Sequence, residues 1–146
     1  MRVVVQRVSQ AEVRVDGVVK SSIRKGLLVL LGMAKADDEA GVVRFAEKLP
    51  RRRFFEDAEG KMNLSLLDVG GSVLVVSQFT LAADLEKGLR PSFTDAMEPP
   101  GAEKLIKKFS NTLRSLGVEV TEGVFGARME VELINDGPVT FIFEGA

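Results

Sequence analysis

The chain has 146 residues, of which 45% are hydrophobic, and a formal net charge of −1. These values predict a single folded domain spanning residues 1–146, with no overall attraction to nucleic acid. The chain contains neither Cys nor His, which excludes disulfides, Ser-His-Asp and Cys-His catalysis and the common zinc sites.

The N-terminal sequence MRVVVQRV lacks the long apolar run and the cleavage site of a signal peptide. The longest apolar run, from Leu27 to Leu31, is too short to span a membrane. We therefore expect a soluble, cytoplasmic protein without membrane association. No metal site and no cofactor is predicted.

The first third of the chain predicts strands. Residues 2–8 are rich in Val, residues 11–15 alternate, and the turn pair Asp16-Gly17 leads into a returning strand at 18–23. Residues 26–33 form a continuous apolar run, which indicates a central strand buried on both faces.

Two helices are predicted further along. The first begins at the acidic residues 37–39 and ends at Pro50. The second carries an apolar stripe over residues 102–116 and ends at Gly117. A second apolar strand, 72–79, and a long loop, 85–101, which holds three of the five prolines, separate the helices.

Three strand-like runs close the chain, at residues 118–125, 128–135 and 139–143. The order of strands, helix, strands, helix and strands predicts an α+β domain. We expect a largely antiparallel or mixed β-sheet, or partial barrel, with two main helices packed on it.

The first stretch that could carry chemistry is SQFTLAAD, residues 77–84, where a buried strand runs into Ser77, Gln78, Phe79 and Thr80. Polar groups at a strand end are held rigidly, and backbone N–H groups that leave the ladder there can stabilise an oxyanion. Thr80 has no His to activate it as a nucleophile. On spacing alone, polar residues that simply finish the strand are the favoured interpretation.

The second stretch is LINDGPVTF, residues 133–141, in which Gly137-Pro138 interrupts a strand-like run. Asn, Asp, Gly and Pro are common turn formers, so a hairpin turn is the first interpretation. The alternative is a special backbone geometry, with positive φ at Gly137 or a cis bond before Pro138, that directs carbonyl oxygens outward.

The third kind of stretch is basic. Residues 51–53 are three consecutive arginines, and Lys104, Lys107, Lys108 and Arg114 lie on the second predicted helix. Either group could contact phosphates, and a solvated surface explains each about equally well.

Taken together, these stretches resemble the D-aminoacyl-tRNA deacylase (D-tyrosyl-tRNA(Tyr) deacylase) family. The resemblance runs from end to end, and the paired SQFTL and NDGPVT motifs are its most specific part. It is carried by QRV (6–8), GLLVLLG (26–32), DAEGKMNLS (57–65), GGSVLVVSQFTLAAD (70–84), RPSF (90–93) and NDGPVTF (135–141).

The resemblance implies a homodimer that hydrolyses the ester between a D-amino acid and the 3′ end of tRNA. It also implies that Gly137 and Pro138 form a cis peptide that enters the partner subunit's active site, where their carbonyls exclude an L side chain. Such a wall cannot exclude glycine, so glycyl-tRNA, including that mischarged on tRNA(Ala), is an expected substrate.

Roles for other residues follow from the same resemblance. The Phe79 N–H would stabilise the oxyanion, Thr80 would position the substrate, and Gln78 would contact its amine or fix the loop. Ser77 is expected to belong to the same catalytic group. The 2′-OH of the tRNA would assist the reaction in place of a side-chain base.

Three more residues complete the predicted site. Arg7 would anchor the inserted Gly-Pro turn. Phe125 and Met129 would form an apolar shelf for the adenine, and core packing explains these two equally well.

Two other functions remain open on the sequence. One is a non-catalytic tRNA-binding or editing-like module with the same fold, which a deacylation assay would separate from the enzyme. The other is a small-molecule hydrolase or deaminase of a different oligomeric α+β family, which would turn over free metabolites without tRNA.

Overall fold

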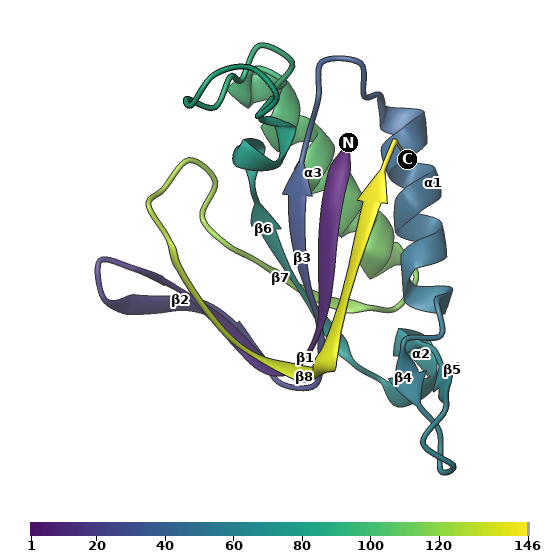
Figure 1. Ribbon diagram of the computed structural model, residues 1–146. Coiled ribbons are helices and arrows are strands. Elements are labelled where there is room, and N and C mark those ends of the chain that lie inside the picture. Colours follow the sequence, from purple (N-terminus) through teal and green to yellow (C-terminus); the bar gives the residue numbers. More distant parts are fainter. Residues whose placement is uncertain (146) are drawn as a thin grey trace.

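The protein is described here by a computed structural model, which covers residues 1–145 (Figure 1). No helix among these residues is long and apolar enough to cross a membrane. The elements in chain order are β1 (Arg2–Val15), β2 (Val18–Ile23), β3 (Gly26–Gly32), α1 (Glu39–Lys48), η1 (Leu49–Arg51), β4 (Phe55–Glu56), β5 (Met62–Leu64), α2 (Leu66–Val69), β6 (Ser72–Ser77), η2 (Phe79–Ala82), α3 (Pro99–Ser115), β7 (Glu119–Glu122) and β8 (Glu130–Glu144).

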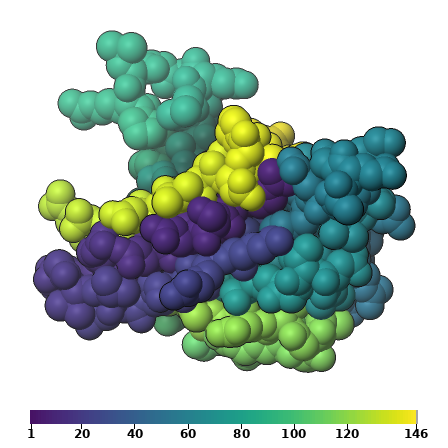
Figure 2. Space-filling model, turned by 90° about the horizontal axis from the view of Figure 1, so that it is seen from below, coloured from purple at the N-terminus to yellow at the C-terminus, as the bar shows by residue number. Residues whose placement is uncertain are grey.

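Six of the strands form one mixed sheet, which confirms the predicted fold class. Its order is β2-β1-β3-β6-β7, and β8 pairs with β1. The pairs β3–β6 and β6–β7 are parallel, whereas β1 pairs antiparallel with β2, β3 and β8. The long strands β1 and β8 lie side by side and bend together, so that the sheet curls toward a partial barrel (Figures 1 and 2).

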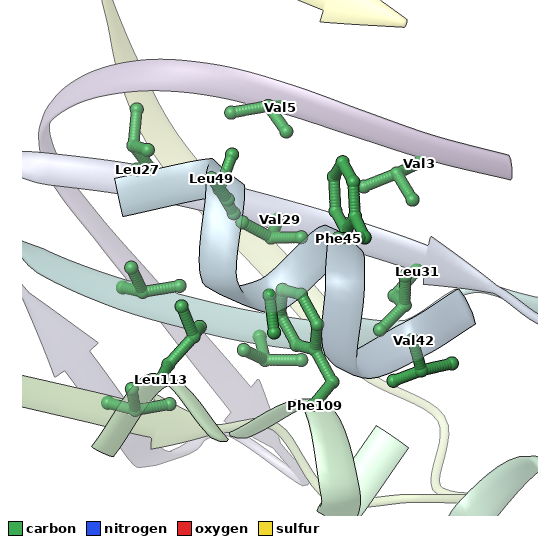
Figure 3. Close-up of a cluster of buried hydrophobic side chains, with 14 of the residues drawn as sticks. Val3, Val5, Leu27, Val29, Leu31, Val42, Phe45, Leu49, Phe109 and Leu113 are labelled. Atoms are coloured by element: carbon green, nitrogen blue, oxygen red, sulfur yellow. The ribbon is translucent and has the colours of Figure 1, made fainter. Parts of the chain in front are cut away.

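Helices α1 and α3 cover one face of the sheet. The apolar residues of each helix recur at helical spacing, so one side of the helix is buried. Phe45 of α1 and Phe109 of α3 stack with ring centroids 5.8 Å apart, above Val3, Val29 and Leu31 (Figure 3).

The opposite face of β3 and β6 is covered by the bent ends of β1, β2 and β8. Leu28 and Leu74 pack there against Val8, Val13 and Ile23. Strand β3 is therefore buried on both faces, as its unbroken apolar run predicts.

Several element boundaries differ from the prediction. The strand expected at 72–79 ends at Ser77, and the loop expected at 85–101 ends at Glu98, because α3 begins at Pro99. Proline is tolerated in the first helical turn, where its missing N–H has no intrahelical acceptor. The short elements β4, β5 and α2 were not predicted.

The predicted hairpin at residues 135–138 is wrong. Strand β8 continues through Gly137-Pro138, and both of its halves pair with β1. The pairs Gln6–Thr140 and Val8–Asn135 flank the interruption, so the single residue Arg7 lies opposite residues 136–139. We call residues 136–139 the Gly-Pro loop.

Candidate functional site

A pocket of about 400 Å³ lies at the carboxyl end of β6, beside the first turn of α3. Its wall is mainly apolar, and among the described residues Glu98 is the only charged one that lines it. The lining residues are Leu31, Met33, Ser77, Gln78, Phe79, Phe93, Ala96, Met97, Glu98, Pro99, Ala102, Ile106, Phe125 and Gly126.

The chain makes an abrupt turn from β6 into η2 at this pocket. The Gln78 N–H still donates to the Leu31 carbonyl at 3.0 Å, but the ladder ends there. The turn packs closely on the end of β3, because a Cβ on Gly32 would lie 2.7 Å from the Gln78 carbonyl oxygen and 2.8 Å from Leu81 Cβ. Glycine at position 32 is thus required for η2 to lie where it does.

The start of η2 presents backbone donors and polar side chains beside the pocket. Among residues 1–145, no backbone carbonyl accepts a hydrogen bond from the Phe79 N–H. Phe79 is the first residue of η2, and the first N–H groups of a helix have no acceptor within that helix. The Gln78 side-chain amide donates to the Thr80 hydroxyl. Gln78 therefore fixes the Thr80 side chain, and Thr80 has a neutral amide rather than a base beside its hydroxyl.

The aromatic side of the pocket comes from separate parts of the chain. Phe79, which is 60% exposed, lies with its ring centroid 5.0 Å from that of Phe93, and Phe125 lines the same pocket. The loop that carries Phe93 is held to the body by a hydrogen bond from the Met97 N–H to the Met33 carbonyl at 3.0 Å. Phe93, Met97 and Glu98 were missed as pocket residues, although RPSF at residues 90–93 is a signal within an otherwise irregular loop.

A larger hollow of about 630 Å³ lies next to this pocket, on the other side of η2. It is lined by the acidic residues Asp84, Glu86, Asp95 and Glu144, and within residues 1–145 Arg2 is the one basic side chain that lines it. So many carboxylates would repel RNA phosphates. The smaller, mainly apolar pocket is therefore the better candidate for an aminoacyl ester of RNA.

The Gly-Pro loop is exposed and is held from below by Arg7. The Gly137–Pro138 peptide bond is cis, and Gly137 has a φ of +144°, a conformation that L side chains rarely adopt. Arg7 is only 4% exposed. Its Nε donates to the Asp136 carbonyl at 3.0 Å, and its Nη1 donates to the Phe54 carbonyl at 2.8 Å.

Asn135 closes the base of the Gly-Pro loop. Its side-chain amide donates to the Arg7 carbonyl and to the Val139 carbonyl, each at 2.9 Å. The two bonds join β1 to both ends of the loop. The side chains of Arg7 and Asn135 thus fix the loop, one from the neighbouring strand β1 and the other from the residue that precedes the loop.

The structure brings some of the predicted site residues together and separates others. Ser77, Gln78, Phe79 and Phe125 line the pocket, with Thr80 next to them. Met129 does not line it: its sulfur accepts from the Val124 N–H at 3.3 Å and it packs in the second core cluster.

Arg7 and the Gly-Pro loop lie far from the pocket of the same chain. Arg7 is level with Leu27 of β3, whereas the pocket begins at Leu31, which is level with Ser77. Along the strands, four residues separate Arg7 from the level of the pocket, which is roughly 13 Å. Across the sheet, β6 lies two strand spacings from Arg7 on β1 and three from the Gly-Pro loop on β8, roughly 10 Å and roughly 14 Å. One chain therefore does not combine the two motifs in one site.

Comparison with known proteins decides the family. The family model described as D-Tyr-tRNA(Tyr) deacylase matches residues 4–144. The chain belongs to the D-aminoacyl-tRNA deacylase family. It is thus an enzyme of the class that hydrolyses aminoacyl-tRNA, and aminoacyl-tRNA is its partner.

Two curated relatives named D-aminoacyl-tRNA deacylase illustrate the similarity. The protein of Thermomicrobium roseum is 57% identical to this chain, and the alignment covers 100% of this chain and 95% of the relative. The protein of Anaeromyxobacter dehalogenans is 55% identical, and the alignment covers 99% of this chain and 97% of the relative.

Solved structures agree with this fold. A protein titled "c-Myc DNA Unwinding Element Binding Protein" is 39% identical, covers 100% of this chain and 99% of its own, and superposes with a TM-score of 0.93. A probable eukaryotic D-amino acid tRNA deacylase superposes with a TM-score of 0.83 over 97% of both chains, at 20% identity.

Proposed function

We propose that this D-aminoacyl-tRNA deacylase works as a homodimer in which the Gly-Pro loop of each subunit enters the pocket of the other. The observation that carries the proposal is the separation of the two motifs within one chain. The pocket at Phe79 is open to solvent, and Gly137 and Pro138 are exposed. A second copy of the chain would supply each with what it lacks.

In this arrangement the Gly-Pro loop excludes L-amino acids. The D and L esters have the same functional groups and differ only in the direction in which the side chain leaves Cα. A fixed backbone wall in the L direction rejects the L ester by steric clash. The bonds from Arg7 and Asn135 support a wall of this kind because they hold the loop at Asp136 and Val139.

Glycine has no side chain to clash with such a wall. Glycyl-tRNA, including glycine mischarged on tRNA(Ala), is therefore a substrate in this proposal. Complete stability of glycyl-tRNA at high enzyme concentration would count against the wall.

Hydrolysis relies on the backbone and on the RNA. The Phe79 N–H stabilises the oxyanion that develops on the ester carbonyl, and one such donor typically contributes about 2.7–4 kcal/mol. The vicinal 2′-OH of the terminal adenosine assists the attack of water. Thr80 positions the substrate, because its hydroxyl faces the Gln78 amide and has no base to deprotonate it.

The test is deacylation of one tRNA charged separately with D-tyrosine and L-tyrosine, and of glycyl-tRNA, at equal enzyme concentration. Loss of the D-tyrosyl and glycyl esters with the L-tyrosyl ester intact is expected. Equal loss of the D and L esters would leave an esterase without the Gly-Pro wall. A Thr80→Ala variant that binds tRNA but has no turnover would refute the positioning role.

A second candidate function is the binding of DNA in addition to deacylation. It is favoured by the name of the solved structure that is 39% identical, which describes binding to a DNA element. The net charge of −1 gives no general attraction for DNA. Binding of DNA by the protein that also cleaves the ester would support this candidate.

A further inference from the structure

Two basic surfaces could meet the phosphates of a bound tRNA. One is the segment Arg51, Arg52 and Arg53, which follows α1, and we call it the arginine segment. The other lies on α3 and includes Lys107, Lys108 and Arg114. The ion pairs of the two surfaces distinguish them.

Three of the four basic residues of α3 are already paired with carboxylates. Lys107 and Arg114 lie 3.4 Å and 3.3 Å from the Glu122 carboxylate. Lys108 lies 2.8 Å from the Glu39 carboxylate and lowers the pKa of that group through a hydrogen bond. The Glu122 and Glu39 carboxylates therefore offset part of the positive charge that this surface could offer an anion.

The arginine segment has no such partners. All three arginines are exposed, and within residues 1–145 none of them forms an ion pair. Arg53 donates to the neutral Asn63 at 3.2 Å, and its charge acts on Asp68 only at longer range. Three adjacent guanidinium groups without carboxylates suit a chain of phosphates, which arginine binds through its fork of N–H donors.

The segment is also fixed relative to the Gly-Pro loop. Arg7 bonds to the Phe54 carbonyl at 2.8 Å and to the Asp136 carbonyl at 3.0 Å, so a single buried side chain joins the two. The Phe54 ring stacks on Phe141 of β8 with centroids 4.2 Å apart, and the Arg52 guanidinium lies over the Phe143 ring. The arginine segment therefore keeps a fixed position relative to the Gly-Pro loop.

We propose that the arginine segment binds the phosphates of the tRNA whose aminoacyl end lies in the partner subunit's pocket. This inference rests on the proposed dimer, because a Gly-Pro loop inserted in the partner's pocket brings with it the arginine segment, to which Arg7 connects it through the Phe54 and Asp136 carbonyls. Each subunit then contributes the chemistry to one ester and the phosphate contacts to the other.

The first test compares two variants that each lose three positive charges. These are Arg51→Gln/Arg52→Gln/Arg53→Gln and, as the matched control, Lys104→Gln/Lys107→Gln/Lys108→Gln. Binding of deacylated tRNA is measured from about 50 to 200 mM salt. Each phosphate contact changes the slope of the log association constant against log salt concentration by about 0.7–0.9. The arginine variant is expected to lose roughly two to three units of slope and roughly 10- to 100-fold in affinity near 0.1 M salt.

Activity separates this inference from the proposed function. The arginine variant should lose kcat/KM on D-aminoacyl-tRNA by the same factor as it loses affinity. It should keep its full rate on 3′-D-aminoacyl-adenosine, which has no phosphates. Equal slopes for the arginine variant and the lysine control would overturn the inference, whereas a wild-type enzyme that cleaves neither ester would overturn the proposed function.

A mixed dimer tests whether the contact crosses the subunit boundary. One subunit carries Phe79→Pro, which removes the oxyanion N–H at a position where the first turn of η2 tolerates proline. The other subunit carries the three arginine substitutions and the only working pocket. A salt dependence of deacylation like that of the wild type supports the contact in trans, and one like that of the arginine variant overturns it.

Discussion

Arg7 provides a sensitive test of how the Gly-Pro loop is held. The side chain is 4% exposed and donates to two carbonyl oxygens, those of Phe54 and Asp136. The Arg7→Met substitution keeps most of the apolar volume but removes both donors. The carboxylates of Glu56 and Asp136, each 3.5 Å from Arg7, also lose their partner.

The size of the effect follows from the burial of the two acceptors. A hydrogen bond from a charged donor contributes about 1.5–3 kcal/mol. The bond to Phe54 is buried, so its carbonyl is left unsatisfied, whereas water can reach the Asp136 carbonyl in the exposed loop. The two carboxylates are more than half exposed and add little. We expect Arg7→Met to reduce the free energy of unfolding by roughly 2–4 kcal/mol.

Arg14→Met is the matched control, because Arg14 lies on the same strand and forms ion pairs with Glu12 and Glu132 at the surface. Such pairs are worth about 0–1 kcal/mol. Urea unfolding gives the stability of both variants, and deacylation of D- and L-tyrosyl-tRNA gives their selectivity. Only Arg7→Met should lose selectivity for the D ester. The role of Arg7 would be refuted if Arg7→Met and Arg14→Met had equal urea unfolding midpoints and the ratio of D-tyrosyl to L-tyrosyl deacylation rates were unchanged in Arg7→Met.

Three further outcomes are expected. Gly32→Ala should greatly reduce deacylation while the sheet stays folded, because its Cβ would lie 2.7 Å from the Gln78 carbonyl and displace η2; kcat and circular dichroism measure the two effects. Phe109→Ala should cost about 3–5 kcal/mol in urea unfolding, since this ring is fully buried. Asp68→Asn should lower the melting temperature at neutral pH, because a backbone hydrogen bond from Ser65 lowers the pKa of Asp68. Its folded pKa lies below its unfolded one, so this stabilisation exists at neutral pH and disappears as the pH falls through the folded pKa. The melting temperatures of Asp68→Asn and the wild type should therefore converge in acid.

Local patterns were sufficient to predict the central elements. The unbroken apolar run of β3 indicates burial on both faces, and that burial is observed. Asp38 caps α1 by accepting from the Gly41 N–H at 2.8 Å, in line with the acidic start of that helix. These features depend on residues close together in sequence.

The short elements and the true course of β8 depend on distant residues instead. Strands β4 and β5 have only two and three residues, and their place is fixed by the bond from Arg7 to Phe54, which are 47 positions apart. Likewise, Gly137-Pro138 reads locally as a turn. What keeps the chain extended past it is the register with β1, whose residues lie more than a hundred positions away.

The continuity of β8 also explains how a four-residue interruption can be firm. A hairpin tip is attached at one base and moves as a unit, whereas the Gly-Pro loop has a paired strand on each side. The Asn135 amide joins the Arg7 and Val139 carbonyls across its base, and Arg7 holds the Asp136 carbonyl from beneath. The discrimination given by a steric wall cannot exceed the free energy needed to move the wall aside. Anchoring on both sides of the loop supplies that cost without any substrate-facing side chain, so selectivity would depend on Arg7 and Asn135, which need not touch the substrate.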